Sequence, residues 1–275
     1  MKKNFFHIGY QHCASTFLQK FIFPNTNFNN NIIKKDLEIS KSRLPDNFGK
    51  FFFYQNNKIF SGFKNLKTPF IYTCEGFLQF IEHDEFYKKN KKKYLGQRVI
   101  AISNLIKYLL SNKNDEILVI IRKQSDLIQS IYSRKYKFFK NENQIFYDFP
   151  FKQISNKRTN RNIKVFDLEG YIYIDSLNYF LNLSIIANII GKDRINILIY
   201  EELELNPKGF LKKLSKIFQV DMRHLEKYST SKVNEKKNNK KISKTMSQKI
   251  DNFFNSSNRN LCREFNLNLK KYNYY

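Results

Sequence analysis

Four short apolar runs along the chain have the pattern of buried parallel strands. Each run is continuous rather than alternating, as in strands that are covered on both faces. The clearest is EILVIIR, a run of Ile, Leu and Val that ends on Arg122. The four runs are residues 4–9, 69–75, 116–122 and 194–200. Because amphipathic stretches separate them, the pattern predicts an α/β fold with three layers, in which a central, mainly parallel sheet lies between helices.

The stretches between these runs have apolar residues three and four positions apart, which predicts helices. The predicted helices are 15–23, 76–82, 98–111, 125–139, 176–191, 207–220 and 246–265. Pro24 and Gly191 are stop signals, and Pro207 occupies a first-turn position. Residues 140–165 lack a period and are interpreted as an excursion over the active face, either a lid or an acceptor-binding loop.

The stretch HIGYQHCASTFLQ, residues 7–19, joins the first predicted strand to the first predicted helix. Ligands of open parallel sheets bind where such loops meet helix N-termini, and the amides of Cys13–Thr16 with two hydroxyls would form an anion cradle. A nucleotide-hydrolysing P-loop has Lys directly before its Ser/Thr pair, but Ala14 stands there, which disfavours ATP hydrolysis. The alternative is that Ser15 and Thr16 only cap the helix.

A second group of residues follows the third predicted strand. Arg122 ends that strand, and Ser130 lies eight positions later on the next helix. A guanidinium at a strand end can bind a phosphate through two parallel hydrogen bonds, and a hydroxyl on the following helix can complete the contact. The alternative is that Arg122 only covers the end of the sheet and that Ser130 is a helix surface residue.

Composition and charge narrow the class of ligand. With 275 residues, 41% of them hydrophobic, the chain can form one domain with a sizeable core. A net charge of +25 favours anionic ligands, so nucleic acid, anionic lipid, phosphorylated cofactors and acidic glycans stay open. Abundant Lys, Asn, Ile, Phe and Tyr are typical of an AT-rich genome, so only the basic clusters 88–94 and 232–241 count as signals.

Cysteine usage and hydropathy indicate the compartment. Cys13, Cys74 and Cys262 form no CxxC pair and no metal-ligand pattern with the histidines, which fits a reduced cytoplasmic setting without a metal. No apolar run approaches the roughly 20 residues of a membrane-spanning helix. We therefore expect a cytoplasmic protein, with peripheral association at the inner membrane as the other option.

These stretches together resemble the sulfotransferases that use 3′-phosphoadenosine-5′-phosphosulfate (PAPS), in particular bacterial ones that act on carbohydrates. The resemblance rests on HIGYQHCASTFLQ, RKQSDLIQSIYSRKY, IYTCEGF, and residues 195–221 and 253–269, and so spans most of the chain. It implies a P-loop NTPase-like fold, a single domain over 1–275, and a basic mobile loop at 229–245. It also implies PAPS as sulfuryl donor and adenosine 3′,5′-bisphosphate (PAP) as product.

The resemblance assigns roles to individual residues. The 5′-phosphosulfate would be held by Gln11, Cys13, Ala14, Ser15 and Thr16. The 3′-phosphate, which distinguishes this donor from ATP, would be held by Arg122 and Ser130. The acceptor would be a hydroxyl of a surface glycan or other carbohydrate.

The same resemblance assigns catalysis to Glu75 and His12. Glu75 matches a position where carbohydrate-acting relatives often carry a Glu, which would act here as general base. The alternative is that Glu75 is a surface or helix-capping carboxylate. His12 stands where the family usually has its catalytic Lys, and an imidazole, with an ordinary pKa near 6.5, needs a phosphosulfate close by to stay protonated at neutral pH. This departure leaves a second reading open: a catalytically impaired homologue that binds nucleotide or glycan. A specific nucleic-acid partner is not expected, because that reading rests on charge alone.

Overall fold

The computed structural model describes part of the chain. The described residues are 3–10, 12–28, 69, 71–74, 78, 107, 110, 112–135, 177–231 and 240–275. The chain divides into two compact units. The first contains Met1–Arg122 and Tyr179–Glu235, and the second contains Lys123–Asn178 and Lys236–Tyr275. The single domain over 1–275 stays a prediction.

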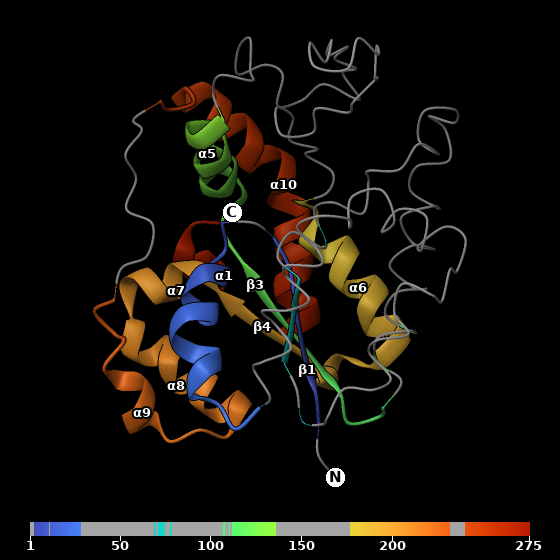
Figure 1. Ribbon diagram of the computed structural model, residues 1–275. Coiled ribbons are helices and arrows are strands. Elements are labelled where there is room, and N and C mark those ends of the chain that lie inside the picture. Colours follow the sequence, from blue (N-terminus) through green and yellow to red (C-terminus); the bar gives the residue numbers. More distant parts are fainter. Residues whose placement is uncertain are drawn as a thin grey trace, which may run out of the picture. The chain divides into compact units, whose positions relative to one another are not determined.

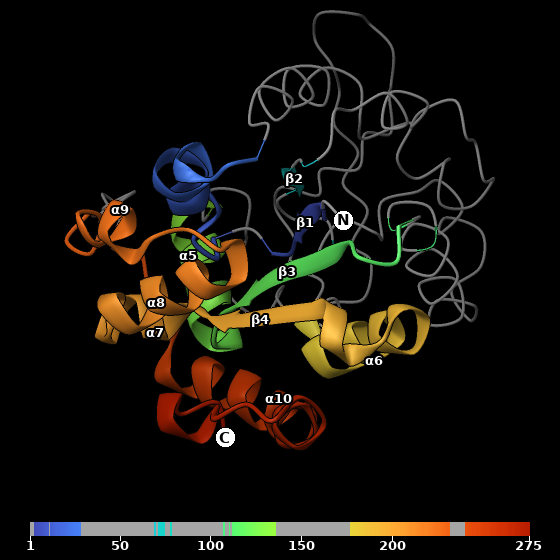
Figure 2. The ribbon, with the colours of Figure 1, turned by 90° about the horizontal axis from the view of Figure 1, so that it is seen from below.

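The first unit contains a four-stranded parallel sheet in the order β2-β1-β3-β4 (Figure 2). Each strand lies within one of the four predicted apolar runs. The strands are β1 (Phe5–Ile8), β2 (Ile71–Cys74), β3 (Glu116–Ile121) and β4 (Ile195–Ile199). With helices flanking the sheet (Figure 1), the predicted α/β class and its mainly parallel sheet are confirmed.

Burial explains why the apolar runs are continuous. All five residues from Ile117 to Ile121 in β3 are at most 1% exposed, so side chains on both faces of this strand are covered. A strand with one solvated face would alternate apolar and polar residues instead. The register places Ile121 beside Ile199 at the carboxyl ends of β3 and β4.

The helical segment after β1 is irregular. It consists of α1 (Ser15–Phe17), a π-helix (Leu18–Ile22) and a 3₁₀ turn (Phe23–Asn25). Pro24 therefore lies inside the 3₁₀ turn and does not end the segment, contrary to its predicted role as a stop signal. Proline has no N–H to donate, so the helical ladder changes type around it but the chain stays coiled.

Other helices of the first unit are α6 (Tyr179–Ile190), α7 (Tyr200–Leu205), α8 (Pro207–Phe218) and α9 (Met222–Glu226). The predicted stop and start signals hold for two of them. Helix α6 ends before Gly191, whose φ of 89° suits glycine, and α8 begins at Pro207 with the Asn206 side chain accepting from the Gly209 amide. The short helix α7 was not predicted, because the sequence reads as strand up to Tyr200.

The second unit pairs helix α5 (Gln124–Lys135) with helix α10 (Lys244–Phe265). A pair of buried side-chain amides joins the two helices. Gln124 Nε2 donates to Asn258 Oδ1 over 2.9 Å, and Asn258 Nδ2 donates to Gln124 Oε1 over 3.1 Å. Asn258 also donates to the backbone carbonyl of Tyr274, which attaches the C-terminus. The helices predicted at 125–139 and 246–265 are thus present, with residues 136–139 outside the described part.

Helix α5 also holds the chain just before α10. The carbonyl of Lys240 accepts from Gln129 Nε2 over 2.9 Å and from Ser133 Oγ over 2.7 Å. The amide of Ile242 donates to Gln129 Oε1 over 2.7 Å. The end of the predicted basic loop 229–245 is therefore attached to α5, while 232–239 and the predicted lid 140–165 lie outside the described residues.

His7, a polar residue in the middle of β1, makes the stability of the fold depend on pH. It is 2% exposed, its Nδ1 lies 2.7 Å from Thr73 Oγ1, and burial lowers its pKa from 6.5 to about 4. In the unfolded chain, His7 is therefore protonated as the pH falls through about 6.5, whereas in the folded chain it is protonated only at about pH 4. We expect His7 to lower the free energy of unfolding by roughly 3 kcal/mol as pH falls through this window.

Urea unfolding at pH 7, 5 and 4 measures this effect. His7→Gln, which keeps a polar side chain but cannot titrate, should lose less stability than the wild type over this range. Parallel pH profiles for the two proteins would show that His7 does not carry the effect.

Candidate functional site

The candidate site lies at the carboxyl ends of β1 and β3. From β1 the chain adds β2 on one side and then returns to add β3 on the other side, so the order reverses between these neighbours. In open parallel sheets, ligands bind in the crevice at such a switch point. The loop after β1 contains His12 to Thr16, and the residue directly after β3 is Arg122.

The loop after β1 has a strained backbone. His12 and Ala14 have φ angles of 64° and 60°, in the left-handed region that non-glycine residues rarely adopt. Each such residue costs about 1–2 kcal/mol, so the surrounding structure imposes the conformation. Ala14 is followed by Ser15 in the right-handed helical region. Successive residues of opposite hand turn their amides toward one side, which forms a concave site for an anion.

Arg122 lies against this loop. Its side chain is buried, with the residue 7% exposed, and Nη1 donates to the His12 carbonyl over 3.1 Å. The guanidinium carbon lies 4.2 Å from the centre of the Tyr200 ring. Within the described residues, Nε has no hydrogen-bond partner, and no carboxylate forms an ion pair with this guanidinium. The Nε nitrogen is itself buried, so the Nε–H is an unsatisfied buried donor among the described residues.

A buried guanidinium that has no counter-charge among the described residues indicates an anion site. Taking such a group out of water costs several kcal/mol unless an opposite charge and hydrogen bonds compensate. The Nε–Nη2 edge of a guanidinium matches two oxygens of a phosphate or sulfate, the geometry of a bidentate contact. The arrangement can thus bind an oxyanion at the end of β3, next to the amides of the β1 loop.

Two buried tyrosines hold the backbone around Arg122. The Tyr179 hydroxyl donates to the Arg122 carbonyl over 2.7 Å. Its ring lies 4.7 Å from that of Tyr10, whose hydroxyl accepts from Asn182 over 2.6 Å. Burial raises the pKa of Tyr179 well above 10, so its hydroxyl keeps the proton that it donates. The strand end that carries the guanidinium is therefore fixed in place.

The structure brings together most of the loop residues that the sequence singled out. His12, Cys13, Ala14, Ser15 and Thr16 lie in one turn, within the same unit as Arg122. Cys13 and Ser15 are buried, and the other three are half-buried.

The remaining predicted residues lie elsewhere. Ser130 belongs to α5 of the second unit, where it is 6% exposed and is therefore not a helix surface residue. Gln11 and Glu75 lie outside the described residues. The roles assigned to all of these residues stay predictions.

Tyr200 is a residue that the sequence alone did not single out for this site. It directly follows β4, the neighbour of β3, and burial raises its pKa to about 12. One signal was available, because residues that follow parallel strands gather at the same edge of the sheet. That signal does not tell which strand lies next to β3.

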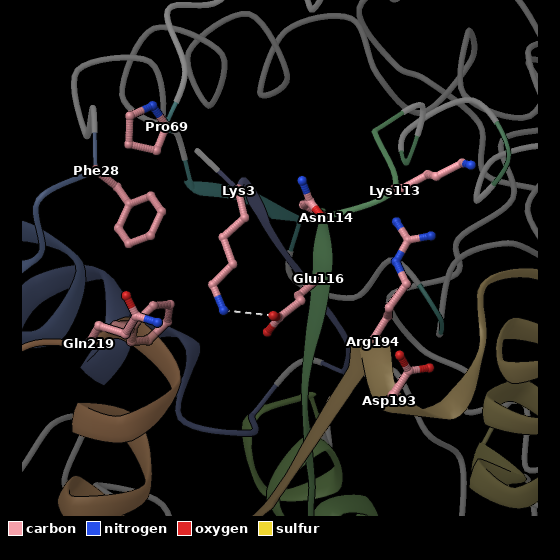
Figure 3. A pocket seen from close by; sticks show the side chains of 10 residues that line it. Lys3, Phe28, Pro69, Lys113, Asn114, Glu116, Asp193, Arg194 and Gln219 are labelled. Atoms are coloured by element: carbon pink, nitrogen blue, oxygen red, sulfur yellow. Dashed lines mark hydrogen bonds and ion pairs between the residues drawn. The ribbon is translucent and has the colours of Figure 1, made fainter. Parts of the chain in front are cut away.

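A second concave region lies at the opposite, amino ends of the strands (Figure 3). It is a pocket of about 520 Å³, with Lys3, Lys113 and Arg194 among its lining residues. Lys3 pairs with Glu116 over 2.6 Å, and Arg194 donates to the backbone carbonyls of residues 112 and 115. Because these contacts satisfy Lys3 and Arg194 internally, the pocket lacks the open buried cation that marks the carboxyl ends.

Neither a membrane-spanning helix nor a metal-binding group occurs among the described residues. None of their helices combines the length and apolar character that crossing a membrane requires. Nor do three or more His, Cys, Asp or Glu side chains gather anywhere among them as a metal-binding group. The expectation that the protein needs no metal stays a prediction.

Comparison with known proteins identifies the fold. No family model and no curated protein sequence matches the chain. Among solved structures it is similar to the crystal structure of a sulfotransferase from Alicyclobacillus acidocaldarius, with a TM-score of 0.56, 11% identity and 98% of both chains covered. The chain therefore has the α/β fold of this sulfotransferase, in agreement with the fold that the sequence resemblance implied.

Proposed function

We propose that the protein is a sulfotransferase that moves a sulfuryl group from PAPS to a hydroxyl, most naturally of a surface glycan or other carbohydrate. The observation that carries the proposal is Arg122. A buried guanidinium whose Nε lacks a partner among the described residues contacts a loop whose backbone suits an anion. This combination occurs at the switch point of a sheet with a sulfotransferase fold.

The donor has two oxyanion groups, and the proposal assigns them to two subsites. Gln11 and residues 13–16 hold the 5′-phosphosulfate through amides and hydroxyls. Arg122 and Ser130 hold the 3′-phosphate. Support comes from the strained turn at Ala14 and from the Nε of Arg122, which is unsatisfied among the described residues. The 3′-phosphate makes the site selective for this donor over ATP.

Sulfuryl transfer requires a proton donor and a proton acceptor. The bond from sulfur to the leaving phosphate oxygen breaks while a bond from sulfur to the acceptor oxygen forms. The acceptor hydroxyl gives its proton to Glu75, acting as general base. The His12 imidazolium donates a hydrogen bond to the leaving oxygen and stabilises its growing charge. The nucleotide product is PAP.

The proposal also covers partners and location. The acceptor is a carbohydrate or another molecule with a free hydroxyl, and no specific nucleic acid is involved. The reaction takes place in the cytoplasm, with peripheral contact to the inner membrane as an option that the net charge of +25 supports.

His12 favours a second candidate function. An imidazole in the place of a lysine weakens the electrostatic part of catalysis at neutral pH but leaves the anion subsites intact. A homologue that binds the nucleotide or a glycan without transfer would have the same Arg122 geometry.

Calorimetric titration of the wild-type protein with PAP tests the proposed function. We expect PAP to bind much more tightly than adenosine 5′-monophosphate, because only PAP carries the 3′-phosphate. Equal affinities for the two nucleotides, or no binding of either, would overturn the proposal.

A further inference from the structure

Tyr200 lies beside Arg122 because of the strand register. Ile121, the last residue of β3, pairs with Ile199, the last residue of β4. The residues that directly follow the two strands are Arg122 and Tyr200, which therefore lie side by side. Helix α7 begins at Tyr200, and its ring turns toward the guanidinium. Long-range pairing of two strands, and not a local motif, creates this contact.

The ring and the loop together restrict the guanidinium. Its carbon lies 4.2 Å from the ring centre, within the range of a cation–π contact. The Tyr200 ring thus contacts one face of the guanidinium, and the His12 carbonyl accepts from Nη1. Together these contacts fix the orientation of the Nε–Nη2 edge. A side chain that is already oriented loses less entropy when it binds a ligand.

The ring holds this charge without neutralising it. A carboxylate at position 200 would form an ion pair with Arg122 and use the Nε–Nη2 edge. The Tyr200 phenol has its pKa raised to about 12, chiefly by burial, so it is neutral at physiological pH. The full positive charge therefore stays available for an anion.

We propose that Tyr200 is a positioning residue that sets the selectivity of the nucleotide site for a 3′-phosphate by orienting the Arg122 guanidinium. This inference rests on the proposed function. It predicts that losing the ring weakens the binding of the 3′-phosphate specifically, while the affinity for a nucleotide without that group stays the same.

The measurement is a selectivity ratio: the Kd of adenosine 5′-monophosphate divided by the Kd of PAP. Tyr200→Phe keeps the ring and should keep the wild-type ratio. Tyr200→Leu removes the ring and should lower the ratio about tenfold, the size expected for a partly desolvated cation–π contact. Tyr275→Leu is a matched control, because it removes another Arg–Tyr contact, with Arg259 at 4.8 Å, in the second unit. It should leave the ratio unchanged.

Each outcome separates the inference from the proposed function. If wild-type protein shows no preference for PAP, the proposed function fails. If wild-type protein prefers PAP and Tyr200→Leu keeps the full preference, the positioning role is overturned. Equal loss of affinity for both nucleotides would indicate a merely structural residue and would also overturn it. Should Tyr200→Leu not fold, Tyr200→Met, with a flexible side chain of similar volume, provides the same comparison.

Discussion

Replacing Arg122 with alanine is expected to lower the affinity for PAP about 10²–10³-fold. Two charge-assisted hydrogen bonds from the Nε–Nη2 edge would be lost, at roughly 1.5–3 kcal/mol each before the site relaxes. The affinity for adenosine 5′-monophosphate should change little. Calorimetry with both nucleotides measures the difference, and Arg122→Lys should be intermediate because it keeps the charge without the planar fork.

Two controls distinguish binding from folding. Arg223→Ala removes an equal charge from the same unit, but this side chain is exposed and pairs with Asp221, so PAP affinity should not fall beyond a small screened effect. Arg122→Met should leave the free energy of unfolding unchanged or raise it, since it removes a buried charge that has no counter-ion among the described residues. A large loss of stability in Arg122→Met would mean that Arg122 is retained for folding.

Replacing His12 with lysine is expected to move the high-pH limit of sulfuryl transfer upward. The acid must be protonated, so its contribution falls as pH rises through its pKa. That limit lies near 6.5 for an unperturbed imidazole and near 10.4 for an unperturbed lysine. His12→Ala should lower turnover by about 10²–10⁴-fold, the usual contribution of a general acid. Rates measured from pH 5 to 9 test both variants.

The backbone makes these variants comparable. His12 has a φ of 64°, and lysine and alanine carry a Cβ as histidine does, so all three bear a similar conformational cost. PAP affinity should stay largely unchanged in His12→Ala. Unchanged turnover in His12→Ala would exclude His12 as the acid. A wild type without turnover, together with an active His12→Lys, would favour the nucleotide- or glycan-binding function.

The sequence predicted the elements well where burial left a pattern. The continuous run at 116–122 identified β3, because only a strand covered on both faces tolerates apolar residues at every position. Pro207 at a first-turn position located the start of α8, where the Asn206 side chain accepts from the Gly209 amide. The path of the chain around Pro24 was missed, because this proline removes one N–H donor from the helical ladder without ending the coiled segment.

The site itself was only partly predictable. Two properties could be read locally: that residues 7–19 connect a strand to a helix, and that Arg122 ends a strand. The left-handed φ of Ala14 could not be predicted from the sequence, because alanine disfavours that region and only the surrounding contacts impose it. The cation–π contact between Arg122 and Tyr200 could not be predicted from the sequence either.

By itself, the sequence determined the number and kind of the described strands, the α/β class, and a list of residues suited to an anion. Local periodicity and residue chemistry carry that information. Only the tertiary structure decided that β1 and β4 flank β3, and therefore that the His12 carbonyl and the Tyr200 ring meet one guanidinium. The physical reason is that strand order and register come from pairing between segments far apart in the chain, which no local pattern specifies.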